Sequence, residues 1–173
     1  PIQTALARLN QNMLLNGTKA ALLPFALADT DDLETLELTE HYLSTVGTAG
    51  HVLSSASTGS EAQEDASRQL PILSRRGDSL VSEGIVPHPT ALKIDVDGAE
   101  HLVLDGLTNS LQRDECSLIY VENHRNLLKN QGIDWRDIEH KLEDCGFETS
   151  RMSLADRSDD SGTYILRGMK PTR

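Results

Sequence analysis

The residues of this sequence best suited to chemistry are two carboxylates separated by a single residue, Asp95 and Asp97. They follow an apolar run that begins at Ala91, and Gly98 comes directly after them. In an open α/β sheet, ligands bind in the crevice beyond the carboxyl ends of the strands. A strand that ends in Asp-x-Asp-Gly therefore places negative charge where a small molecule is held. Lys93 is two residues from Asp95 and shares its face of the strand, so we expect an ion pair between them.

More polar residues follow other predicted strands or begin a helix. Glu122 and His124 come after the apolar run 117–121, and a histidine there is suited to deprotonating a hydroxyl because its unperturbed pKa lies near neutrality. Glu100 lies one turn into a predicted helix, where a carboxylate favours the helix dipole or contacts substrate. Asp29 closes an earlier predicted strand, where an aspartate either contacts a ligand or forms the turn that follows.

The order of the predicted elements indicates the α/β class. Apolar residues recur at helical spacing in 2–15, 99–112 and 133–145, and a short helix begins at Gly77 with Asp78 or Ser79 as its cap. Short strands are predicted over 20–28, 33–38, 70–73, 91–96, 117–121, 147–154 and 162–167. This alternation favours a mostly parallel sheet with helices on both faces, closed by an antiparallel C-terminal hairpin.

The 173 residues are enough for a single domain, 1–173, with a proper core. Residues 44–69 are rich in Gly, Ser, Thr and Ala, without apolar periodicity. A segment of this length inside a compact domain is a flexible insert or a substrate lid.

Composition excludes several classes of partner. The formal net charge of −11 disfavours nucleic acid and anionic membrane surfaces, and no apolar run is long enough to span a membrane. The two cysteines, Cys116 and Cys145, lie in no Cys/His cluster, so we expect buried thiols in a reducing cytoplasm and no zinc. The sequence is compatible with a monomer or a homo-oligomer.

Residues 93–106 carry a family resemblance. Lys93 to Glu100, followed by Val-Leu-Asp-Gly at 103–106, resembles the "KIDVEGAE…VLKG" signature of FkbM-type methyltransferases. Further matches occur in the family's order along nearly the whole chain: the "P…L…N…LNG" helix over 1–17, the "A(L/V)(S/A)D" strand end at 26–29, the "LDSL" helix at 78–80 and the "(I/V)E.H" strand end at 121–124.

The resemblance implies a Rossmann-like class I fold and an S-adenosylmethionine-dependent O-methyltransferase acting on a small-molecule or sugar hydroxyl. It implies Asp95 and His124 as catalytic residues, with Asp29, Ala28 and Asp95 at the cofactor. It implies that Asp97, Glu100 and Glu122 bind the substrate, and it implies no metal ligand. Family members begin with a strand and a glycine-rich cofactor loop of the "D.GAN.G" type, which this sequence lacks. We therefore expect the native protein to extend upstream of Pro1, and the domain described here to lack its first two strands.

Two other readings stay open on the sequence alone. Asp-x-Asp also occurs in glycosyltransferases, where the pair binds a divalent metal that bridges a nucleotide-sugar diphosphate. The missing glycine-rich loop also fits a degenerate domain that has lost cofactor binding and serves in protein interactions.

Overall fold

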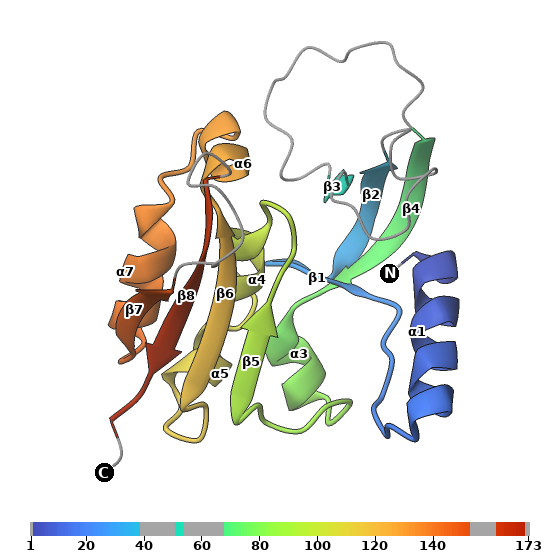
Figure 1. Cartoon of the computed structure of the whole chain (residues 1–173), viewed down its shortest axis with the longest axis horizontal. Coiled ribbons are helices and arrows are strands. Elements are labelled where there is room, and N and C mark those ends of the chain that lie inside the picture. Colours follow the sequence, from blue (N-terminus) through green and yellow to red (C-terminus); the bar gives the residue numbers. More distant parts are fainter. Residues whose placement is uncertain (1, 39–50, 54–67, 153–161, 172–173) are drawn as a thin grey trace.

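The computed structural model describes residues 2–38, 51–53, 68–152 and 162–171. It is a mixed α/β structure in which the described strands form two four-stranded sheets (Figure 1). The α/β class and the C-terminal antiparallel hairpin are confirmed. A single, mostly parallel sheet is not found among these strands, because parallel pairing is limited to β1 with β4 and β5 with β6.

The first sheet has the order β1-β4-β2-β3, with β1 at Ala26–Leu27, β2 at Asp32–Leu38, β3 at His51–Leu53 and β4 at Arg68–Arg75. The pairing of β2 with β4 is antiparallel over seven residues, from Asp32 with Ser74 to Leu38 with Arg68. The strand expected over 20–28 is limited to the two residues of β1. Directly after β1, the Ala28 N–H donates a hydrogen bond to the Arg75 carbonyl of β4. Most of the predicted 44–69 insert lies outside the described residues, so its role as a lid stays a prediction.

The second sheet carries the carboxylates and has the order β5-β6-β8-β7. Its strands are β5 at Ala91–Ile94, β6 at Leu118–His124, β7 at Glu148–Met152 and β8 at Thr163–Met169. The predicted run 117–121 is therefore too short, since Glu122, Asn123 and His124 belong to β6 and pair with β8. Burial alternates along β6, so that Ile119, Val121 and Asn123 face one side and Tyr120, Glu122 and His124 face the other.

Helices α4 (Glu100–Asp105), α5 (Thr108–Gln112) and α7 (Arg136–Asp144) supply the apolar cover of one face of this sheet. Leucines and a valine from α4 and α5 pack with Ile138 and Leu142 of α7 against Ile94, Ile119, Val121 and Leu166. A smaller core joins the first sheet to α4 through Ala28, Leu36, Ile72, Ala99 and Leu102. Val96 is partly buried against both cores.

The helix predicted over 99–112 is broken into α4 and α5 at Gly106. A Cβ at Gly106 would lie 2.0 Å from the carbonyl oxygen of Ala28, so only glycine lets the two segments approach this closely. The break between α4 and α5 therefore lies where the chain passes closest to Ala28.

The remaining helices are α1 (Gln3–Asn16), α3 (Gly77–Ser82) and α6 (Arg125–Asn130), of which α6 was not anticipated. The C-terminus of α1 is closed by Gly17 in the left-handed conformation, as its sequence predicts. Asp78 does not cap α3. Its carboxylate instead accepts the N–H groups of Asn109 and Ser110 and the Ser110 hydroxyl, and so ties α3 to α5.

Among the helices of the described residues, none has the length and apolar character that a membrane crossing requires. Cys116 is fully buried and Cys145 half-buried, and neither forms a disulfide. Burial raises the pKa of both thiols.

Candidate functional site

The carboxyl ends of β5 and β6 bring Asp95, Asp97 and His124 together. These strands are parallel and in step, with Ile94 opposite Val121, so the residues that follow Ile94 meet the last residues of β6. One donor atom from each of the three side chains lies within 4.8 Å of the other two. We name these three residues the strand-end cluster. It confirms that the two groups of polar residues, separate in the sequence, meet at one edge of the sheet.

A tight turn holds Asp97 in the cluster. Asp97 has a φ of 43°, which is unusual outside glycine, and Gly98 follows with a φ of 94°. A Cβ at Gly98 would lie 2.9 Å from the Cβ of Leu127, because α6 packs directly over this turn. Figure 1 shows α6 at the end of β6 that carries His124. The turn thus directs Asp97 toward β6 and leaves no room for a side chain at residue 98.

Glu100 links the turn to the histidine. Its side chain is fully buried, and its Oε1 atom accepts the Gly98 N–H at 3.1 Å and lies 2.6 Å from Nδ1 of His124. Oε2 of Glu100 has no hydrogen-bond partner among the described residues. Because Nδ1 faces Glu100, Nε2 is the imidazole nitrogen that points to the cluster, 3.5 Å from Oδ1 of Asp97. The sequence suggested only a helix-dipole or substrate role for Glu100 and did not reveal this contact.

Burial and charge act in opposite directions on His124. Burial lowers its pKa, but the hydrogen bond to Glu100 and the charges of Glu100, Asp97 and Glu122 outweigh burial, so the pKa is raised. Oε1 of Glu122 lies 3.9 Å from Nε2, which places this carboxylate beside the cluster. His124 is therefore an imidazole held between carboxylates, with 11% of its side chain exposed.

Asp95 is the exposed member of the cluster. The ammonium of Lys93 donates to Oδ2 of Asp95, which confirms the ion pair expected from their spacing. Both side chains are about half exposed, so the pair is screened by solvent and adds little stability. The carboxylate of Asp95 is accessible to a ligand.

Ala28 and Asp29, the two residues after β1 that are expected at the cofactor, differ in how far they are buried. Ala28 is 1% exposed and packs in the smaller core, which leaves its side chain no surface to offer a cofactor. Asp29 is half-buried, and its backbone carbonyl accepts Nη1 of Arg76. A contact of Ala28 or Asp29 with a cofactor stays a prediction.

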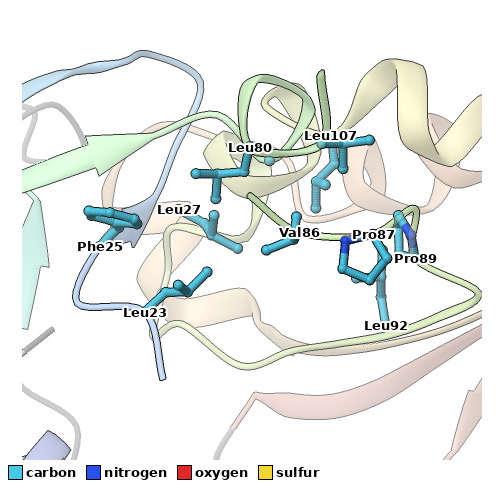
Figure 2. Close-up of a pocket in the computed structure, with 11 residues that line it drawn as sticks. Leu23, Phe25, Leu27, Leu80, Val86, Pro87, Pro89, Leu92 and Leu107 are labelled. Carbon is cyan, nitrogen blue, oxygen red and sulfur yellow. The ribbon is translucent and has the colours of Figure 1, made fainter. Parts of the chain in front are cut away.

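An apolar groove of about 430 Å³ lies beside β5. Figure 2 shows Leu23, Phe25, Leu27, Val86 and Leu92 converging on it, with carbon atoms making almost all of the lining. The groove shares no lining residue with the strand-end cluster. It offers surface to a flat, apolar group and few partners for a charged one.

The arrangement of carboxylates at strand ends can be compared with known proteins. The sequence profile of the "Methyltransferase FkbM domain" matches residues 3–149. The chain belongs to the FkbM methyltransferase domain family. The matched residues include the first sheet, strands β5 and β6 and the whole strand-end cluster, and they end just inside β7. The match confirms the resemblance carried by residues 93–106.

One curated relative in this comparison is the hexuronic acid methyltransferase AglP of Haloferax volcanii. It is 37% identical to this FkbM-family chain over 78 residues, which are 45% of the chain and 29% of AglP. The matched part is thus less than a third of the relative's length. No solved structure matches the chain.

Proposed function

We propose that this chain takes part in S-adenosylmethionine-dependent methylation of a hydroxyl group on a small molecule or sugar. The family membership supports methyl transfer, and the strand-end cluster supports a hydroxyl as the acceptor. A neutral hydroxyl is a poor nucleophile, so its methylation gains from groups that bind the oxygen and remove its proton. Asp95, Asp97 and His124 supply such groups at the edge of the sheet where α/β proteins hold their ligands.

The single observation that carries the proposal is the convergence of this cluster on one point. Asp95 is exposed and can accept a proton or a hydrogen bond from an acceptor hydroxyl. His124 presents Nε2 toward the same point, with its other nitrogen fixed by Glu100. Positioning the acceptor oxygen is the main requirement, because the cofactor supplies an already electrophilic methyl group when bound.

The described residues fit the cofactor in part. The groove beside β5 suits the faces of an aromatic base, since Phe25, Leu27 and Leu92 line it. Its lining lacks the charged and hydroxyl-binding groups that a ribose and an amino-acid end require. Asp95 at the strand end and Asp29 after β1 are the residues we propose for those polar contacts.

The relative suggests which acceptors to test first. AglP is a hexuronic acid methyltransferase by name, so hexuronic acids and their glycosides head the panel, followed by neutral sugars and other alcohols. Methyl transfer is measured with the native-length protein and isotope-labelled S-adenosylmethionine. A glycosyltransferase would instead consume a nucleotide sugar with manganese, and an interaction domain would consume neither.

The decisive variant is Asp95→Ala combined with His124→Ala. We expect methyl transfer to be abolished, because both proton-accepting groups are gone. Calorimetry with S-adenosylhomocysteine should show that His124→Ala alone keeps cofactor affinity within a few-fold of the unsubstituted protein, whereas the double variant also loses the proposed cofactor contact of Asp95. Turnover that survives the double substitution would refute the assignment of the cluster as the acceptor site.

A further inference from the structure

We propose that Asp95, Asp97 and His124 bind one divalent cation, although the family resemblance implies no metal ligand. The proposal concerns the same site as the methyltransferase function and rests on it for the cation's role. Cation binding itself is independent of that function and can be measured without any turnover.

The spacing of the donor atoms suits a single cation. Ligand bonds of about 2.1 Å place neighbouring ligands of an octahedral cation about 3 Å apart and opposite ones about 4.2 Å apart. Nε2 of His124 and Oδ1 of Asp97 are 3.5 Å apart, and all three donors lie within 4.8 Å of one another. Small rotations of the two carboxylates bring the set to coordination distances. The exposed side of Asp95 leaves further positions for water or an acceptor oxygen.

The buried carboxylate of Glu100 also supports a cation at this site. A histidine that ligates a metal almost always directs its other nitrogen to a carboxylate, a backbone carbonyl or water. Glu100 occupies that position behind His124, 2.6 Å from Nδ1. Its side chain is fully buried, and Oε2 finds no hydrogen-bond partner among the described residues. Burying a carboxylate that has one oxygen without a partner costs free energy. A cation bound at Nε2 of His124, on the other side of the imidazole ring, would offset the negative charge of Glu100.

The charge around the cluster also favours a cation. Asp97, Glu100 and Glu122 lie around the imidazole of His124, and Asp95 belongs to the same cluster. Lys93 pairs with Asp95 from a half-exposed position, where solvent screens its charge. Several carboxylates close together favour a bound cation.

The donor set identifies the class of cation. Two carboxylate oxygens and one imidazole nitrogen suit Mn²⁺, and Mg²⁺ accepts the same carboxylates with water completing its shell. Such a cation would hold the acceptor oxygen and lower the pKa of its hydroxyl. With the cation bound, Nε2 of His124 would be a ligand instead of the proton acceptor. Glu122, whose Oε1 lies 3.9 Å from Nε2 of His124, would then be the nearby carboxylate for the acceptor's proton.

Mn²⁺ is the probe for the test. The native-length protein is stripped with a chelator and titrated with Mn²⁺, and free Mn²⁺ is followed by electron paramagnetic resonance. We expect one site per chain. Asp97→Asn and His124→Gln should each weaken binding more than tenfold, while Glu100→Gln should weaken it about tenfold to a hundredfold through the orientation of His124. Glu115→Gln removes an exposed carboxylate that pairs with Arg113, away from the cluster, and should leave the affinity unchanged.

Lys93→Gln gives a change in the opposite direction. Removing the ammonium frees Asp95 of its competitor, so we expect tighter Mn²⁺ binding with the same stoichiometry. Circular dichroism establishes that each variant is folded. Substoichiometric binding, or affinity that Asp97→Asn and His124→Gln leave unaltered, would overturn the cation site.

The outcomes separate this inference from the proposed function. Mn²⁺ binding that follows the expected variant pattern without methyl transfer to any acceptor supports the cation site and counts against the methyltransferase assignment. Full methyl transfer by the chelator-stripped protein overturns the cation's role at this site.

Discussion

Nδ1 of His124 lies 2.6 Å from Oε1 of Glu100, and the two residues come from different elements, β6 and the first residue of α4. The same Glu100 oxygen accepts the Gly98 N–H, so one atom joins the turn that carries Asp97 to the strand that carries His124. The geometry of the strand-end cluster therefore depends on a residue that does not itself reach the surface.

Glu100→Gln should lower methyl-transfer turnover about tenfold to a hundredfold, in line with the effect of losing a carboxylate behind a functional histidine. The amide still accepts the Gly98 N–H, so the melting temperature should change little. Steady-state kinetics and calorimetric melting measure the two effects separately. Turnover equal to that of the unsubstituted protein would show that Glu100 does not position His124.

Gly98→Ala should destabilise the fold more than Gly132→Ala. Both glycines have positive φ, 94° and 77°, so both alanines incur a conformational cost of about 1–2 kcal/mol. Only at residue 98 does the added Cβ also meet a neighbour, Leu127, whereas nothing lies within 4 Å of one at residue 132. Urea unfolding of the two variants measures the difference. Equal losses would mean that α6 yields to the extra methyl group.

Gly106→Ala should be strongly destabilising for a purely steric reason. Gly106 has an ordinary φ of −72°, but its Cβ would lie 2.0 Å from the Ala28 carbonyl oxygen. Overpacking of this kind costs about 1–3 kcal/mol or more. Denaturant unfolding gives the size of the loss, and a variant as stable as the parent would indicate that β1 moves freely away from α4.

Asp31→Asn should remove a pH-dependent part of the stability. The Ser79 hydroxyl, the Arg75 guanidinium and the Arg76 backbone N–H lower the pKa of Asp31 from its ordinary value of 3.8 to about 2. Because the folded-state pKa is depressed, the contribution is present above pH 4 and is lost as the pH falls from about 4 to 2. Asp31 is exposed, so screening by solvent and salt reduces the effect.

The measurement is urea unfolding of both proteins at pH 6 and at pH 2.5. The unsubstituted protein should be the more stable at pH 6, and the difference should shrink at pH 2.5. A difference that does not depend on pH would show that the Asp31 contacts are not formed in solution.

The sequence was sufficient for the elements that local chemistry specifies. Gly17 ends helix α1 at positive φ, and alternation placed Lys93 beside Asp95. Asp95 and Asp97, and likewise Glu122 and His124, were each expected at or after the end of an apolar strand, and the parallel pairing of β5 with β6 brings the two groups together. These inferences need only nearest neighbours along the chain or the period of a strand.

The rest depended on contacts between distant residues. The backbone at Gly106 lies close against the Ala28 carbonyl, and Asp78 binds α5 rather than its own helix. From the sequence, Glu100 had a helix-dipole or substrate role. Its contact with His124 joins residues 24 positions apart, so local spacing does not indicate it.

Val96 lies between the two acidic residues in sequence and packs against both hydrophobic cores. The position of the turn that carries Asp97 therefore depends on the packing of both cores. The proposed methyl transfer should then be lost on heating or in denaturant before the helical signal, because it requires both cores to be packed together.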